Sequence, residues 1–347
     1  MKNNSFSGIA GDGIKAICLF AFFCLFYNLG FSQKGNKNKK PIAVIFDTDI
    51  GPDYDDVGAI TLLHAFADNK ECTILATMAS NSHPRIAAVL NIFNTYFNRA
   101  DLPIGVVKGQ SVNIGASQKW DSVIEKNYPH RIQSNEEAED AVSLYRKLLS
   151  AQPDQSVTII TVGFLTNMAN LLNSKPDNNS PLDGKALVKR KVKLLVSMAG
   201  RFDQEMEKFK EFNVVRDAAS SRIVFDQWNT PIIFSGFEIG VKLHTGLPLL
   251  SSSIQNSPVK EVFEISIPMS PQDKNGRMSW DQTAVLIAVR GYEKYYYGVK
   301  GKIIGKDDGS HGWDNNGKGH IYVKEKLPVI EVTTIINNLM LHQPVKH

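Results

Sequence analysis

Five aspartates within ten residues form a dense cluster of carboxylates near the start of the chain, in the segment Asp47-Thr48-Asp49-Ile50-Gly51-Pro52-Asp53-Tyr54-Asp55-Asp56. Carboxylates this close together repel one another unless a cation or bound protons neutralise them. Oxygen ligands in such number suit Ca²⁺ or Mg²⁺ better than zinc. The spacing therefore predicts an active site that holds a hard divalent cation.

The elements around the cluster predict where it lies in the fold. The residues from Ile42 to Phe46 are apolar and rich in β-formers, which predicts a buried strand. Gly51 and Pro52 break regular structure, and apolar residues return with helical spacing from Val57. A strand, an acidic loop and a helix in this order place ligands at the carboxyl end of a parallel strand.

Three other interpretations of the acidic loop compete with a metal site. A solvated turn is disfavoured because five aspartates lie directly behind a buried strand. An EF-hand would need an oxygen ligand where Gly51 stands and a closing glutamate, which this segment lacks. Phosphatases of the haloacid dehalogenase type also open on strand-Asp-x-Asp. Their pattern usually has Thr or Val at the position of Gly51, and it does not explain Asp55-Asp56. A metal-bearing active site is the preferred interpretation.

The motif Asp-Thr-Asp-x-Gly-x-Asp-x-Asp-Asp, followed by a helix that starts with small residues, resembles the opening motif of the nucleoside hydrolases. The loop is two residues longer than in the best-known members of that family. Three later segments resemble further family motifs in the same order: Gly-x-Leu-Thr-Asn at 163–167, Glu-Phe-Asn at 211–213 and Trp-Asp at 280–281. Each alone could be a helix cap, but their order and spacing favour a functional role.

The resemblance implies a Ca²⁺ cofactor. The implied ligands are three carboxylates and one main-chain carbonyl, namely Asp49, Asp56, Asp281 and the carbonyl of Val162. Asp49 is also implied to be the catalytic residue, which takes the proton from an attacking water whose pKa the metal lowers. For Asp47 and Asp53 two roles stay open, orienting the loop and replacing a ligand in this longer variant.

The resemblance also implies a sugar-binding site. Asp55 would bind the 2′-hydroxyl of a ribose, Asn213 its 3′-hydroxyl, and Glu211 would lie near its 5′ end. Asn81 would help to align the sugar, and Met198 would lie against it. Taken singly, polar residues ahead of a helix are more often caps.

Trp280 marks a departure from several relatives, which have a histidine at this position that can protonate the departing base. Tryptophan is no useful proton donor, but its indole can stack on a purine or a pyrimidine, so we assign Trp280 to substrate binding. Four histidines remain as candidate acids, and the sequence does not distinguish them: His83, His130, His244 and His311.

Alternating strand and helix patterns predict an α/β fold with a mainly parallel central sheet flanked by helices on both faces. Strands are expected at 42–46, 72–79, 104–107, 157–162, 192–198 and 231–234, and helices at 84–97, 138–149, 168–172, 218–228, 258–265 and 281–289. The resemblance implies a Rossmann-like core in one nucleoside hydrolase-like domain over residues 41–347. The segment 108–136 has little periodicity, and two interpretations stay open, a functional lid and an insertion without a role.

The N-terminus predicts export. Basic residues precede an apolar run from Ala16 to Phe26, and small residues before Gln33 offer a cleavage site, so residues 1–32 are interpreted as a signal peptide. The run is too short for a membrane span, and no lipid anchor is expected at Cys24. Residues 33–40 would form a flexible basic leader. We expect a periplasmic or secreted protein without a stable membrane anchor.

Composition narrows the range of partners. The formal charge of +4 becomes +3 once the signal peptide leaves with two lysines and one aspartate. Basic residues cluster only in the leader and at 189–191, so nucleic acid is not an expected partner. Cys72 would be the single cysteine of the exported chain, which therefore has no internal disulfide.

The activity that the resemblance implies is hydrolysis of the N-glycosidic bond of a ribonucleoside to ribose and free base, as in purine and pyrimidine salvage. The transition state of such a reaction resembles an oxocarbenium ion. Two alternatives stay open, a non-catalytic receptor that captures a nucleoside or sugar through calcium, and a hydrolase of another N- or O-glycoside. The preferred base and the oligomeric state, a homo-oligomer included, are also open.

Overall fold

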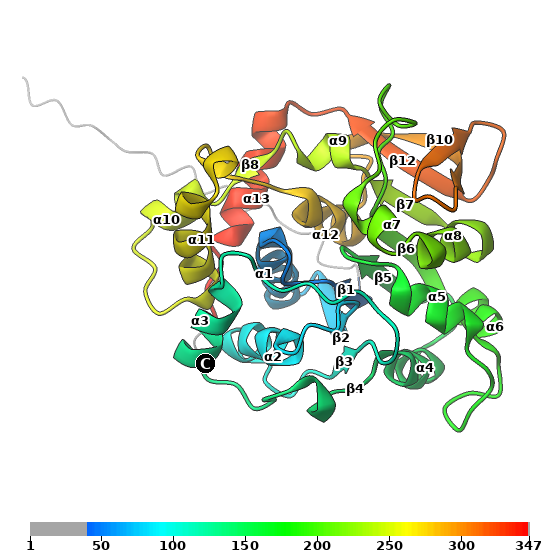
Figure 1. The fold of residues 1–347 in the computed structure, drawn as a ribbon, viewed down its shortest axis with the longest axis horizontal. Coiled ribbons are helices and arrows are strands. Elements are labelled where there is room, and N and C mark those ends of the chain that lie inside the picture. The colour runs from blue at the N-terminus through cyan, green and yellow to red at the C-terminus, as the bar shows by residue number, and fades with distance from the viewer. Residues whose placement is uncertain (1–39, 346–347) are drawn as a thin grey trace, which may run out of the picture. The chain divides into compact units, whose positions relative to one another are not determined.

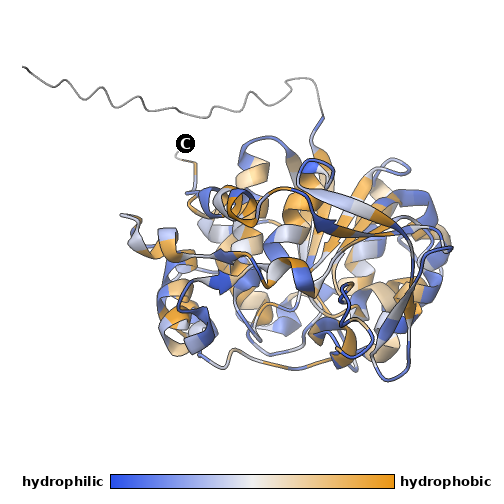
Figure 2. Cartoon of the chain, turned by 90° about the horizontal axis from the view of Figure 1, so that it is seen from above, coloured by the Kyte–Doolittle hydropathy of each residue, from blue (hydrophilic) through white to orange (hydrophobic). Residues whose placement is uncertain are grey.

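Central strands that are buried on both faces organise the fold. In β1, Val44 and Phe46 lie in one hydrophobic core and Ile45 lies in the other. Because successive side chains of a strand point to opposite faces, an unbroken apolar run such as Ile42–Phe46 is what a strand covered on both sides requires. Figure 2 shows these hydrophobic strands at the centre of the fold, with hydrophilic residues on the outer surfaces of the helices.

The structure is a computed structural model, and it describes residues 40–345. Ten strands form one sheet in the order β11-β10-β12-β7-β6-β5-β1-β2-β3-β4. Neighbouring strands from β12 to β4 pair in parallel, whereas β10 is antiparallel to both β12 and β11. The strands are β1 (Ile42–Thr48), β2 (Cys72–Ala79), β3 (Ile104–Val106), β4 (Glu139–Asp140), β5 (Val157–Thr161), β6 (Val192–Met198), β7 (Ile232–Ser235), β10 (Tyr296–Gly305), β11 (His311–Asp314) and β12 (His320–Glu325).

Helices cover both faces of this sheet (Figure 1). On one face lie α1 (Asp55–Asp68), α2 (Ile86–Tyr96), α3 (Trp120–Asn127), α11 (Pro258–Met269), α12 (Trp280–Arg290) and α13 (Val329–Met340). On the other lie α4 (Ala141–Ala151), α5 (Thr166–Asn173), α6 (Gly184–Lys191), α7 (Phe212–Arg216) and α8 (Ala218–Gln227). The short helices α9 (Phe237–Gly240) and α10 (Leu247–Ser251) and the two-stranded sheet of β8 (His244–Thr245) and β9 (Arg277–Met278) lie between β7 and α12 in the chain.

The predicted α/β class with a mainly parallel sheet is confirmed. The strands predicted at 72–79 and 192–198 have those bounds in the structure. The larger parts of the fold that were not predicted are α6, the helix α3 within the segment 108–136, and the C-terminal region from β10 to α13, and several short elements such as α9 and α10 were not predicted either. The predicted signal peptide and the leader up to residue 39 lie outside the described residues.

The segment 108–136 is only partly irregular. Its helix α3 carries Trp120 and Ile124 into the hydrophobic core, where both are fully buried. The stretch before this helix is tied down at both ends, because Val112 bridges to Asn81 and the amide of Gln118 donates to the hydroxyl of Ser270 at 3.0 Å. The helix is therefore part of the packed core rather than a free flap. Among the helices within residues 40–345, none combines the length and the apolar character that crossing a membrane requires.

Candidate active site

The acidic loop lies at the carboxyl ends of neighbouring parallel strands. It leaves β1 after Thr48 and reaches α1 at Asp55, while β2, β5 and β6 end beside it in the same sheet. This is the edge where open α/β sheets bind ligands. A pocket of about 330 Å³ opens here, lined by Asp49, Asp53, Asp55, Val162, Met198, Glu211, Phe212, Asn213, Phe237, Gln272, Arg277, Met278, Trp280 and Asp281.

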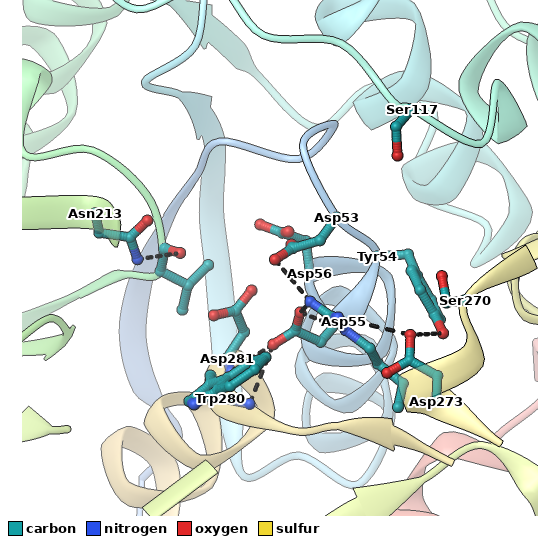
Figure 3. Close-up of polar contacts among 12 residues, drawn as sticks. Asp53, Tyr54, Asp55, Asp56, Ser117, Asn213, Ser270, Asp273, Trp280 and Asp281 are labelled. Carbon is teal, nitrogen blue, oxygen red and sulfur yellow. Dashed lines mark hydrogen bonds and ion pairs between the residues drawn. The ribbon is translucent and has the colours of Figure 1, made fainter. Parts of the chain in front are cut away.

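Four of the five loop aspartates gather with Asp281, and Figure 3 shows Asp53, Asp55, Asp56 and Asp281 around one space with Asn213 across from them. Asp56 is fully buried and accepts a hydrogen bond from the hydroxyl of Thr48 on one oxygen. Its other oxygen, Oδ2, is buried without a hydrogen-bond partner among the described residues. Carboxylate oxygens of Asp53, Asp55 and Asp56 lie within 4.8 Å of one another. An orphaned buried carboxylate oxygen beside other carboxylates fits a bound metal ion.

The electrostatics of the cluster point the same way. Burial raises the pKa of Asp49, Asp56 and Asp281 well above the usual range, and the negative charge of neighbouring aspartates raises it further. Without a cation these groups therefore bind protons more readily than ordinary aspartates do. A divalent ion would replace the protons and keep the carboxylates charged.

Val162 directly follows β5 and lines the same pocket, and its main-chain carbonyl has a partner within the protein. The amide of Asn213 donates to it at 3.2 Å and to the carbonyl of Met198 at 3.1 Å. These contacts place Asn213 between the strand ends of β5 and β6.

Asp47 has a different environment from the other loop aspartates. Its Oδ2 accepts hydrogen bonds from the hydroxyl of Tyr145 at 2.8 Å and from the amide of Asn167 at 3.0 Å. Burial raises its pKa to about 7. Asp47 does not line the pocket, so its contacts join β1 to α4 and α5 and support the start of the loop.

Glu211 caps a helix and lines the pocket at once. Its carboxylate accepts hydrogen bonds from the main-chain N–H groups of Gly200, Asn213 and Val214 at 2.9–3.2 Å. Burial raises its pKa to about 7, against the lowering by these donors. Met198 is 4% exposed and lines the same wall. The Glu-Phe-Asn segment thus brings two polar side chains to the pocket on one short helix start.

Asp55 is bound by protein groups on both oxygens. Oδ1 accepts from Nε and Nη2 of Arg277 at 3.2 and 2.8 Å. Oδ2 accepts from the main-chain N–H groups of Trp280 and Asp281 at 3.1 and 3.3 Å. Asp55 therefore links the start of α1 to the start of α12. The same Nη2 of Arg277 lies 2.7 Å from Asp53.

The side chain of Trp280 forms one wall of the pocket. Its indole N–H donates to the carbonyl of Phe237 at 2.9 Å, and the two aromatic rings lie 5.3 Å apart. The indole nitrogen therefore has its hydrogen-bond partner within the protein, and the guanidinium of Arg277 lies over the indole ring at 5.1 Å. None of His83, His130, His244 and His311 lines the pocket.

Asn81 uses its whole side-chain amide on main-chain groups. It donates to the carbonyls of Asp49 and Ile114 at 2.9 and 2.7 Å, and it accepts from the N–H groups of His83 and Ile114 at 3.1 Å each. The structure places Asn81 behind the acidic loop, outside the set of residues that line the pocket. It holds the loop against the segment around residue 114.

Comparison with known proteins identifies this arrangement. Residues 44–324 match the family model described as inosine-uridine preferring nucleoside hydrolase. The chain belongs to this family. The pyrimidine-specific ribonucleoside hydrolase RihA of Escherichia coli O81 (strain ED1a) is 27% identical over 205 residues, which are 57% of this chain and 61% of that protein. The chain therefore spans less than two thirds of the length of that relative.

Solved structures of nucleoside hydrolases share the fold. The plant nucleoside hydrolase PpNRh1 gives a TM-score of 0.66 at 17% identity, covering 86% of this chain and 99% of that one. The inosine-uridine preferring nucleoside hydrolase from Bacillus anthracis gives a TM-score of 0.63 at 13% identity, again covering 86% and 99%. At such identities the likeness establishes the fold and leaves the substrate open.

In this nucleoside hydrolase family member, five residues that line the pocket had no role assigned from the sequence. Phe212 lies inside the Glu-Phe-Asn motif, and four lie outside the family motifs, namely Phe237, Gln272, Arg277 and Met278. The sequence offered one indication of a residue such as Arg277, because a cluster of buried carboxylates requires a positive charge nearby. Its position in the sequence, 222 residues after Asp55, did not indicate the partner.

Gly163 also belongs to the structure of the site, and only glycine fits at its position. A Cβ atom at this position would lie 2.4 Å from the main-chain nitrogen of Asp49 and 2.6 Å from its Cβ. The turn after β5 thus approaches the acidic loop more closely than any side chain allows, which accounts for glycine in this nucleoside hydrolase motif.

Proposed function

We propose that this protein is a calcium-dependent hydrolase that cleaves the N-glycosidic bond of ribonucleosides to ribose and free base. One observation carries the proposal. The pocket brings together the buried carboxylates of Asp49 and Asp281 and the polar side chains of Glu211 and Asn213, beside the orphaned oxygen of Asp56. Family membership and the name of the relative RihA, a pyrimidine-specific ribonucleoside hydrolase, support it.

The donor set favours calcium over softer metals. Asp49, Asp56 and Asp281 offer carboxylate oxygens, and Val162 offers a main-chain carbonyl oxygen. Ca²⁺ takes oxygen ligands of this kind and tolerates irregular geometry. When bound, it would lower the pKa of a water molecule toward neutrality.

Each residue of the pocket has its own role in the proposed reaction. Asp49 takes the proton from the attacking water. Glu211 and Asn213 hold the sugar hydroxyls, with Met198 against the ring of the sugar. Trp280 offers its ring to the base, because its N–H is already used by the carbonyl of Phe237.

The test is hydrolysis by the purified protein with calcium, using uridine, inosine and p-nitrophenyl riboside, whose leaving group needs no acid. We expect release of base or nitrophenol, and a loss on the order of 10³-fold in Asp49→Asn. Asp101→Asn, at an exposed carboxylate far from the pocket, is the matched control. Calcium-dependent binding of nucleoside without release from any of the three substrates would reject the hydrolase and favour the receptor. The receptor has one observation in its favour, because no histidine among the described residues lines the pocket.

Export is part of the same proposal. The apolar run at 16–26 and the small residues before Gln33 support it. A nucleoside hydrolase outside the cytoplasm would act on nucleosides before uptake.

A further inference from the structure

The hydrogen bonds of Asp55 leave no acceptor position for a substrate. An ionised carboxylate has about four lone-pair sites. In Asp55 two are used on Oδ1 by Arg277 and two on Oδ2 by the N–H groups of Trp280 and Asp281. The residue is 1% exposed. A sugar hydroxyl could bind here only by displacing one of these contacts.

Asp53 has the opposite environment. Its Oδ2 pairs with Nη2 of Arg277 at 2.7 Å, and its side chain stays 42% exposed at the pocket. Nη2 of Arg277 thus contacts both the buried Asp55 and the accessible Asp53, while Nη1 lies 3.7 Å from the buried Asp273. A single cation thus holds two carboxylates side by side, of which one remains open to a ligand.

The loop is anchored directly after Asp53, which fixes the position of Asp53. The next residue, Tyr54, is fully buried, and its hydroxyl donates to Asp273 at 2.7 Å. Its ring packs edge-on against Phe263 at 5.1 Å and under the guanidinium of Arg277 at 5.0 Å. The loop therefore presents Asp53 from a rigid support, as a side chain that binds a ligand with directionality requires.

We propose that in this chain Asp53, and not Asp55, accepts the hydrogen bond from the 2′-hydroxyl of the ribosyl group, while Asp55 and Arg277 form a positioning pair. The inference rests on the proposed function and reassigns one contact within it. Asp55 acts through its hold on the starts of α1 and α12. Asp53 supplies the open carboxylate oxygen that a hydroxyl donor needs.

The test compares Asp53→Asn with Asp55→Asn by calorimetric binding of ribose and 2-deoxyribose in the presence of calcium. The wild-type protein is expected to prefer ribose, because only ribose carries the hydroxyl. Asp53→Asn should lose this preference, with a fall on the order of 10- to 100-fold in affinity for ribose alone. Its melting temperature should stay close to that of the wild-type protein, and its calcium affinity should fall much less than in Asp56→Ala, because one nearby negative charge is lost but no ligand.

Asp55→Asn should behave differently, because it weakens the junction of two helices. We expect a lower melting temperature and weaker binding of both sugars, with the preference for ribose retained. If this variant does not fold, Asp53→Asn decides alone. Arg277→Lys, which keeps the charge but not the two-sided geometry, should lower the melting temperature and weaken the preference for ribose.

Three results would overturn the inference. One is a preference for ribose that survives in Asp53→Asn, and another is a wild-type protein with no preference. The third is a loss of calcium affinity in Asp53→Asn as large as that in Asp56→Ala, which would make Asp53 a metal ligand. Hydrolysis is measured separately from sugar binding. If the protein cleaves no nucleoside but Asp53 still discriminates ribose from 2-deoxyribose, the proposed activity is rejected and the role of Asp53 in sugar binding is retained.

Discussion

Asp56 holds one carboxylate oxygen in a buried position without a protein partner. Such an atom costs free energy unless a cation or proton satisfies it. We predict that Asp56→Ala lowers calcium affinity at least about 100-fold, because it removes a ligand and one negative charge. The fold should persist, because the change also removes the repulsion between Asp56 and its neighbours Asp49, Asp55 and Asp281.

Calorimetric titration with calcium measures this effect, and the melting temperature without calcium checks the fold. The matched control is Asp101→Ala, at an exposed carboxylate. Unchanged calcium affinity in Asp56→Ala would remove Asp56 from the metal site.

Trp280 is the residue that we propose to contact the base. Its indole N–H is bound to the carbonyl of Phe237, so a base can meet only the aromatic ring. We predict that Trp280→Ala lowers turnover of natural nucleosides roughly 10-fold more than turnover of p-nitrophenyl riboside. Trp280→Phe keeps an aromatic face and should retain most activity. Trp280→His should retain or improve activity on natural nucleosides.

Steady-state kinetics on both substrate types measures the difference. Equal losses on natural nucleosides and on p-nitrophenyl riboside in Trp280→Ala would mean that the ring only packs the pocket wall. Asp49→Ala provides the contrast, because the attacking water is needed whatever the leaving group and both substrates should fail together.

At the scale of elements, the short helix α9 carries a carboxylate that titrates near neutrality. Glu238 accepts the main-chain N–H of Phe202 at 3.0 Å, and burial raises its pKa from 4.5 to about 7. The folded state therefore binds this proton more tightly than the unfolded state. Its contribution to stability is fully present below about pH 4.5 and is lost as the pH rises toward 7.

We predict that Glu238→Gln, which keeps an acceptor for Phe202 but cannot ionise, removes this pH dependence. The variant should be at least as stable as the wild-type protein at pH 8, and the two should converge toward pH 4.5. Urea unfolding across this range measures the slope. A wild-type slope that persists in Glu238→Gln would assign the titration to another group.

Local patterns explain which elements could be predicted from sequence. β2 and β6 are apolar runs between turn residues, so their bounds follow from composition. β10 has a mixed burial pattern at the edge region of the sheet, and α6 ends in three basic residues, so neither has a clear apolar period. Such elements are formed by tertiary contacts that a local pattern does not contain.

In the site, too, some contacts could be predicted from local sequence and others could not. The aspartates of residues 47–56 are close in sequence, so their proximity in space could be inferred from spacing. The contact of Arg277 with Asp55 spans 222 residues and depends on how β9 meets α1. The commitment of the Asn81 amide to the main chain depends on the path of the segment near Ile114. Resemblance to a motif suggests a role for a residue, but it does not reveal which hydrogen bonds of that residue are already used within the protein.

At the scale of the whole molecule, the compact unit begins at Lys40, the last residue of the predicted leader. If residues 1–32 are a signal peptide, the chain recovered from its native host outside the cytoplasm should begin at or near Gln33. N-terminal sequencing of that protein measures this. An intact Met1 on cytoplasmic protein would count against export.

Because Gly163 lies so close to Asp49, we expect that a steric clash alone can abolish activity. Gly163→Ala changes no charge, no ligand and no hydrogen-bonding group, yet its methyl would need the space of the Asp49 main chain. We predict that this variant folds with a melting temperature lowered by a few degrees and loses most activity, because Asp49 is pushed off its working position. Activity equal to the wild-type enzyme would show that the loop yields freely. If activity is lost as predicted, one methyl group is enough to inactivate the protein while every aspartate of the motif stays in place.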